Sequence, residues 1–258
     1  MTVALDVLAA HADALLRASE IPDYPNAVNG VQFAHRGPVH KIATAVDASQ
    51  RTIEGAIAAG ANLLIVHHGL FWSGLQPITG YHHHRIRMLL GADIAVYAAH
   101  LPLDAHETLG NSRLLARVLG LDVATGFAHF KGTACGVQGT ADIATSELVS
   151  VTDAFARAHG GRALASATSP DQRTRRWAIC SGAPIDHALL AEVRAGGIDT
   201  LIVGEGPHWS AVEAPERGVT IVYAGHYATE TLGVAALGQH LSATFGVPHE
   251  FIAAPTGL

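Results

Sequence analysis

Short apolar runs recur in the first half of the chain, and each ends in small or polar residues. Three of them, Lys41–Val46, Leu63–Val66 and Ile94–Ala99, have the length and composition of buried strands in a parallel sheet. The segments between them predict helices, one over Gln50–Ala59 and one that ends at Leu90. This alternation predicts an α/β fold whose parallel strands are joined by right-handed crossovers.

The segments that flank these strands have other patterns. Val3–Ala18 combines spaced leucines and valines with many alanines, which predicts an amphipathic helix. Ile21–Phe33 contains two prolines, two asparagines and a glycine, which indicates a loop. Asn111–Leu119 predicts a short helix. Either Ser49 or Asp47 is expected to cap the helix that follows it.

The pattern of the first half returns after a less regular middle. Residues 123–176 are rich in glycine, alanine and threonine, with one predicted helix at Leu148–His159. Strands and helices then alternate again. The predicted strands are Trp177–Cys180, Asp199–Val203 and Val219–Gly225, and the predicted helices are Asp186–Ala195 and Thr231–Phe245.

The two halves can be aligned with one another. The matching stretches are ANLLIVHHGLFW (61–72) with IDTLIVGEGPHW (198–209), and IAVYAAHLPLD (94–104) with TIVYAGHYATE (220–230). Chance similarity between two alanine-rich stretches is the alternative to a duplication. The match extends to polar residues, because His100 aligns with His226 and Asp104 with Glu230, and this favours a duplication.

The repeat predicts the domain organisation. We expect two α/β lobes, residues 1–125 and 126–258, with mostly parallel sheets and helices on both faces. The C-terminal helix is expected to pack back on the first lobe, so that the two lobes form a single functional unit.

Composition narrows the class of protein. The 258 residues are 49% hydrophobic and 15% charged, which allows a sizeable core. No apolar run reaches the roughly 18 residues of a membrane span, and the start lacks the basic segment and cleavage site of a signal peptide. Cys135 and Cys180 form no paired motif. With a net charge of −6, we expect a cytoplasmic protein that binds neither membranes nor nucleic acid.

Histidines and carboxylates follow the predicted carboxyl ends of the strands. His67 and His68 close one strand, Asp104 follows the next, and His226 and Glu230 follow the equivalent strand of the second half. Ligands collect at this edge of open α/β sheets. The five side chains therefore converge if the two halves face each other. A hydrogen-bonded pair of loop histidines is the alternative explanation of His67 and His68.

This set of side chains predicts two divalent metal ions. Imidazole and carboxylate together suit zinc, manganese, iron, cobalt or nickel. Five protein ligands are too many for one open tetrahedral site, but they fit two metals that share a bridging carboxylate. The assignment is His67 and Asp104 on one metal, His68 and His226 on the other, and Glu230 across both. His100 is expected to orient Asp104 without binding metal itself.

Short motifs along the chain resemble the NIF-three-like family, whose members are also labelled GTP cyclohydrolase 1 type 2. They are NGVQF (29–33), AVDAS (45–49), HHGLFW (67–72), HLPLDAHETLGNS (100–112), VGEGPHW (203–209) and AGHYATET (224–231). The resemblance covers essentially the whole chain. It implies two interlocked α/β lobes, a dinuclear metal centre with ligands at the five positions above, and toroidal homohexamers. Some relatives carry an inserted middle domain, which this chain is expected to lack.

Glu205, His208 and the run His82–His84 are the other polar positions with candidate functions. Glu205 and His208 lie at the strand end equivalent to His67 and His68, and either a general acid/base role or a substrate contact is plausible for them. The run His82–His84 is more typical of an exposed loop or a helix start than of a ligand set. No phosphate-binding or dinucleotide glycine fingerprint is present.

The ligand set and the resemblance together predict a dinuclear metal-dependent hydrolase. The resemblance implies GTP or a related nucleotide as the small-molecule substrate, with hydrolytic opening of the purine ring. A phosphoester or an amide would suit the same centre. The alternative is a metal-binding hexamer that delivers metal or acts as a scaffold without turnover, for which Glu205 and His208 would not be needed.

Overall fold

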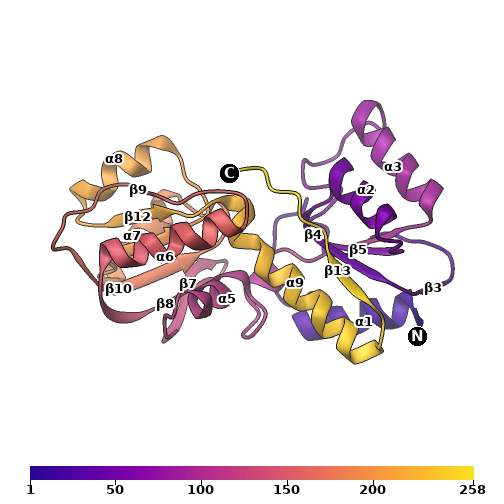
Figure 1. Cartoon of the computed structure of the whole chain (residues 1–258), viewed down its shortest axis with the longest axis horizontal. Helices are drawn as coiled ribbons and strands as arrows, with labels where there is room; N and C mark the ends of the chain where they lie inside the picture. The colour runs from indigo at the N-terminus through magenta and orange to yellow at the C-terminus, as the bar shows by residue number, and fades with distance from the viewer. The chain divides into compact units, whose positions relative to one another are not determined.

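The polypeptide divides into two structural units in this computed structural model, which describes residues 1–258. Unit 1 comprises residues 1–106 and 233–254, and unit 2 comprises residues 107–232 and 255–258. The division falls inside the long helix α9 (His226–Phe245), so its first turns belong to unit 2 and its later turns to unit 1. Figure 1 labels the helices and strands of both units.

Unit 1 contains a five-stranded sheet with the order β13-β4-β5-β6-β2. Its central strands are parallel and nearly all buried, because helices cover both faces, and this is why they read as continuous apolar runs. The parallel strands are β13 (His249–Phe251), β4 (Ile42–Asp47), β5 (Leu63–His68) and β6 (Ala95–Ala98), and β2 (Gly30–Phe33) is antiparallel beside β6.

The loop predicted over Ile21–Phe33 is wrong for its last four residues, which form β2. Val31 is exposed, and the pairing register shifts between Val31 and Phe33. This short edge strand therefore has neither an apolar run nor a strict alternation from which a strand could be predicted. Gly30 begins the strand with a φ of 99°, which glycine adopts without a side-chain clash.

Helices cover both faces of the unit 1 sheet, as Figure 1 shows. α2 (Gln50–Ala58) and α3 (Gly80–Ala92) pack on one face, through apolar side chains of β4, β5 and β6. α1 (Leu5–Leu16) and the later turns of α9 cover the other face. There the buried hydroxyl of Tyr97 on β6 donates a hydrogen bond of 2.8 Å to Asp13 on α1. The sheet is thus the middle of three layers.

Three smaller features complete unit 1. Ser49 is the cap of α2, since its hydroxyl accepts from the backbone N–H of Thr52 and the Thr52 hydroxyl accepts from the backbone N–H of Ser49. β1 (Val3–Ala4) and β3 (Pro38–Val39) pair as a small antiparallel ribbon. A single helical turn, α4 (Leu101–Asp104), follows β6.

Unit 2 contains a six-stranded sheet with the order β7-β8-β10-β11-β12-β9. The predicted strands at its centre are parallel, and three antiparallel pairings are added around them, so this sheet is mixed and not mostly parallel. The strands are β7 (Thr125–Phe130), β8 (Thr133–Ala144), β9 (Leu164–Ala165), β10 (Arg173–Cys180), β11 (Thr200–Val203) and β12 (Thr220–Tyr223).

The hairpin formed by β7 and β8 was not predicted from the sequence. Its two strands are joined by Lys131 and Gly132, whose φ angles of 48° and 88° fit the tight turn that suits a twisted hairpin. Lysine is uncommon at the first of these turn positions, and the strands are rich in glycine, alanine and threonine. Pairing with β10, and not local propensity, therefore decides this region.

Helices also cover both faces of the unit 2 sheet. α7 (His187–Gly196) and α8 (His208–Glu216) share one apolar cluster with the sheet. α5 (Asn111–Val118), α6 (Thr145–Ala158) and the first turns of α9 share the cluster on the other face. Trp177 of β10 is fully buried in that second cluster.

The two sheets share a topology that matches the internal repeat. β4, β5 and β6 are parallel and bordered by antiparallel β2, and β10, β11 and β12 are parallel and bordered by antiparallel β9. The α/β class predicted from the sequence is confirmed. None of the helices has both the length and the hydropathy needed to cross a membrane.

A half-buried histidine makes the stability of unit 1 depend on pH. The Nε2 atom of His249 lies 2.9 Å from the Thr44 hydroxyl, and burial lowers the pKa of His249 below 6.5, although Glu250 opposes the shift. The unfolded chain therefore takes up a proton that the folded chain does not as the pH falls below 6.5. This contribution to stability is complete above pH 6.5 and is lost below it.

We expect His249→Gln to reduce the loss of stability on acidification, because glutamine can still bond to Thr44 but does not titrate. The measurement is the urea unfolding midpoint at about pH 7.5 and about pH 5.5 for both proteins. His83→Gln removes an exposed histidine and is the matched control. An unchanged acid sensitivity in His249→Gln would contradict the assignment.

Candidate metal centre

Four histidines at the strand ends share one arrangement: the Nδ1 atom of each faces an oxygen that can only accept a hydrogen bond. The bonds are His67 to the Ala99 carbonyl at 2.8 Å, His68 to Asp47 at 2.9 Å, His100 to Asp23 at 2.8 Å, and His226 to Glu205 at 3.0 Å. Because carbonyls and ionised carboxylates have no hydrogen to donate, each Nδ1 must carry the proton. In its neutral form each ring then has its lone pair on Nε2, the arrangement that metal-binding histidines show.

The sheet of unit 1 positions His67 and His68. Asp47 is the last residue of β4 and pairs in register with His68 at the end of β5, so its carboxylate lies beside the imidazole. Ala99 follows β6 on the other side of β5 and accepts from His67. The two rings are thus held by opposite neighbouring strands, yet their centroids are only 4.9 Å apart.

Asp104 completes the predicted ligands of unit 1. It lies on the short helix α4, and its carboxylate oxygen is 3.4 Å from Nε2 of His67. Both side chains are buried. Two donor atoms of one tetrahedral zinc ion, each at about 2.0–2.2 Å from the metal, lie about 3.4 Å from each other. The separation of His67 and Asp104 therefore fits a shared cation.

His100 lies with the two strand-end histidines. One ring nitrogen of each of His67, His68 and His100 can be chosen so that all three lie within 4.8 Å of one another. The hydrogen-bond partner of the His100 ring is Asp23, whereas the sequence had suggested that His100 orients Asp104. Burial lowers the pKa of His100 and outweighs the opposing effect of Asp23, so the ring is neutral, as a metal ligand must be.

Asp23 is a residue of the candidate site that sequence reasoning missed. Burial alone would raise its pKa, but hydrogen bonds from His100, Asn29 and the Tyr24 backbone hold the pKa of this carboxyl below its usual range. Its second oxygen also accepts from the backbone N–H of Leu101. Asn29 in turn accepts from the backbone N–H of His100. The signal that could have found Asp23 is its place just before the NGVQF motif.

Aromatic side chains border the histidine cluster of unit 1. The ring of Trp72 is 4.4 Å from His100 and 4.7 Å from His68, measured between centroids. Tyr24 meets the edge of Trp72 and is 48% exposed. An apolar border of this kind lowers the local dielectric around a metal and limits the access of water.

The start of α9 provides the corresponding cluster in unit 2. His226 and Glu230 are one helical turn apart, and Nε2 of His226 lies 3.2 Å from the Glu230 carboxylate. Burial alone would lower the pKa of His226, but Glu230 and Glu205 outweigh it and raise the pKa to about 9. A proton therefore lies between imidazole and carboxylate at neutral pH in the metal-free chain, at a position suited to a cation.

The other predicted site residues have different surroundings. Glu205 follows β11 and accepts from Nδ1 of His226, so it holds a candidate ligand in place. His208 begins α8, is exposed, and its ring makes no hydrogen bond or ion pair; its catalytic role stays a prediction. The run His82–His84 lies in the first turns of α3, with His82 buried against Phe71.

Several known proteins resemble this chain over most of its length. A GTP cyclohydrolase 1 type 2 homolog of Deinococcus radiodurans is 38% identical in an alignment of 250 residues that covers 94% of this chain and 90% of that protein. A protein of the same name from Halobacterium salinarum is 41% identical in an alignment of 244 residues that covers 92% of this chain and 94% of that one. The solved structure of protein ybgI, described as of unknown function, covers 99% of this chain and 100% of its own, with 33% identity and a TM-score of 0.88.

The family is settled by a match that spans almost the whole sequence. The profile described as Duf34/NIF3 (NGG1p interacting factor 3) matches residues 6–256. The resemblance inferred from the motifs is therefore confirmed, and this chain belongs to the Duf34/NIF3 family.

Proposed function

We propose that this protein is a dinuclear metal-dependent hydrolase that opens the purine ring of GTP or a related nucleotide. Its metal ligands are His67, His68 and Asp104 from unit 1 and His226 and Glu230 from unit 2. The substrate class comes from the name that the relatives carry. The proposal that ligands from both units bind the same pair of metals rests on the internal repeat and on the family's motifs.

One observation supports the metal assignment: in all four strand-end imidazoles the Nδ1–H group donates a hydrogen bond to a carboxylate or a carbonyl. Isolated structural histidines do not need this, because either ring nitrogen can serve as donor or acceptor. Metal ligands do need it, since the bond fixes the tautomer and the ring orientation. Asp104 and Glu230 add carboxylates at 3.4 Å and 3.2 Å from an Nε2 atom.

The bound metals would supply Lewis-acid chemistry, which makes water a nucleophile near neutral pH and polarises the bond that is attacked. The chain's own residues prepare the site for this. Glu205 and Asp47 orient His226 and His68 through charged hydrogen bonds. Trp72 shields the unit 1 cluster from water.

A metal-binding protein without turnover is the second candidate, and one observation favours it. Glu205 already accepts a hydrogen bond from His226, and the ring of His208 has no hydrogen-bond partner. Neither side chain is therefore oriented as a general acid or base would be. In either case we propose assembly into a homohexamer, which light scattering of the purified protein tests.

The metal content of the purified protein tests the ligand assignment. We expect two divalent ions per chain in the wild type, and one or none in His68→Ala, measured by elemental analysis of purified protein. Metal-loaded wild type is expected to turn over GTP, and chelation or Glu230→Ala to abolish turnover. Full activity after the metal is stripped would end the hydrolase proposal. Two bound metals without turnover of nucleotide, phosphoester or amide substrates would favour the second candidate.

Gly182 provides a test of the position of Glu230. This glycine has a φ of 70°, and a Cβ atom there would lie 2.3 Å from Oε1 of Glu230 and 3.5 Å from Nε2 of His226. Gly120 has a φ of 71° with open space around the same atom, so it is a matched control. Alanine at either position costs about 1 kcal/mol of backbone strain.

We expect Gly182→Ala and Gly120→Ala both to lose thermal stability through backbone strain, and Gly182→Ala to lose more, because its methyl group also meets the buried Glu230 carboxylate. Only Gly182→Ala should also lose metal, because its methyl group displaces the Glu230 carboxylate. Melting temperatures and metal content of both variants check this. Normal metal content in Gly182→Ala would show that Glu230 is not a ligand in this position.

Glu205 provides a test of how His226 is held. Glu205→Gln keeps an acceptor near Nδ1 but removes the charge, and loss of such a partner typically weakens metal affinity about 10–100-fold. Glu216→Gln removes an exposed carboxylate with no hydrogen bond or ion pair and is the control. The measurement is competition for the metal with a chelator of known affinity. Equal affinities in the two variants would mean that Glu205 does not support the site.

A further inference from the structure

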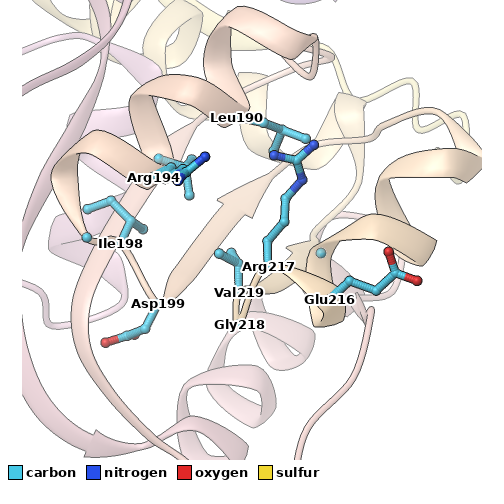
Figure 2. A pocket seen from close by; sticks show the side chains of 11 residues that line it. Leu190, Arg194, Ile198, Asp199, Glu216, Arg217, Gly218 and Val219 are labelled. Carbon is cyan, nitrogen blue, oxygen red and sulfur yellow. The ribbon is translucent and has the colours of Figure 1, made fainter.

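A pocket lies at the amino ends of β11 and β12 in unit 2, beside the last turns of α7 and α8 (Figure 2). Its volume is about 480 Å³, within the range of small-molecule sites. Glu205 and His226 follow the carboxyl ends of the same two strands. The pocket is therefore at the opposite edge of the sheet from those candidate metal-site residues.

The floor of the pocket is apolar. Five aliphatic side chains form it, and each is less than 9% exposed: Leu190, Val193, Ile198, Ala214 and Val219. All five belong to the core cluster that α7 and α8 share with the sheet, so the floor is rigid. A rigid aliphatic surface favours a ligand with an apolar body, since burying that body releases water from both surfaces.

Two arginines form the charged part of the wall. Figure 2 shows the long side chain of Arg217 crossing the pocket toward Leu190, with the guanidinium of Arg194 on the facing wall. Arg194 forms no side-chain hydrogen bond or ion pair. Arg217 contacts one oxygen of Glu213 at 3.2 and 2.6 Å through Nε and one Nη atom, which leaves the other Nη for a ligand.

The two carboxylates that line the pocket form no ion pair with these arginines, and the Arg217 pair is with Glu213 outside the lining. Asp199 accepts the backbone N–H groups of Arg175 and Arg176, both at 2.9 Å, so it ties β10 to the start of β11. Glu216 makes no ion pair, and Figure 2 shows both carboxylates directed away from the guanidinium groups. The helix ends favour basic residues in general. That preference explains why arginines occur there, but it does not explain an apolar hollow between them.

We propose that this pocket binds a small organic anion, an apolar ring or chain that carries one carboxylate or one phosphate group. The planar guanidinium groups match the oxygens of either anion. The aliphatic floor holds the apolar part. Binding here is independent of the metal centre.

The test is a fluorine NMR titration of the full chain with two probes, 4-fluorobenzoate and 4-fluorophenyl phosphate. The neutral 4-fluorobenzyl alcohol has the same ring without the anion, and inorganic phosphate has the anion without the ring. The variants are Arg194→Gln and Arg217→Gln. Arg36→Gln removes an exposed arginine of unit 1 and is the matched control. Metal content is measured for every variant.

We expect at least one fluorinated anion to bind, with the alcohol and inorganic phosphate weaker by about tenfold or more. Each pocket variant should lose about tenfold in affinity, because a charged hydrogen bond is removed. Arg36→Gln should bind as the wild type does, and metal content should not change. The probe that binds more tightly identifies the anion as carboxylate or phosphate.

Three outcomes would overturn the proposal. They are the absence of binding at millimolar concentrations, equal binding of the alcohol or of inorganic phosphate, and unchanged affinity in both pocket variants. None of them bears on the proposed metal ligands of unit 2, His226 and Glu230, which follow the carboxyl end of β12 at the other edge of the sheet.

Discussion

The hydrogen bond from an imidazole Nδ1 to a fixed acceptor is the interaction on which the candidate site depends. A histidine can bind a metal only if one ring nitrogen offers its lone pair in a fixed direction. In this protein four imidazole rings are oriented by four different acceptors, which are three carboxylates and one backbone carbonyl. Each acceptor comes from a segment other than the histidine's own. The packing of the segments therefore sets the chemistry of the rings.

Parallel strands make this possible. A parallel strand buried on both faces rarely holds an ionisable side chain along its length, so imidazoles and carboxylates gather where the strand ends. β4 and β5 show the consequence, since Asp47 and His68 are paired in register at their carboxyl ends. The same architecture recurs in unit 2, where Glu205 follows β11 and His226 follows β12. A duplicated unit thus provides two polar edges from one plan.

The opposite edge of the unit 2 sheet has a different character. There the strands begin, two helices end, and the aliphatic core comes close to the surface between two arginines. Fold alone assigns no function to either edge. What distinguishes them is the type of side chain: imidazole and carboxylate at one edge, guanidinium and aliphatic carbon at the other.

The sequence by itself determined the α/β class, the central strands, most helices and the type of residue at each strand end. These features depend on local periodicity or on motifs that can be read within a few residues. It could not identify Asp23 as the partner of His100, because 77 residues separate them and only the fold brings them together. The β7–β8 hairpin was likewise decided by its pairing with β10. Tertiary structure also pairs Glu205 with His226. A hydrogen bond between a loop residue and the first residue of a helix produces no periodic pattern in the sequence.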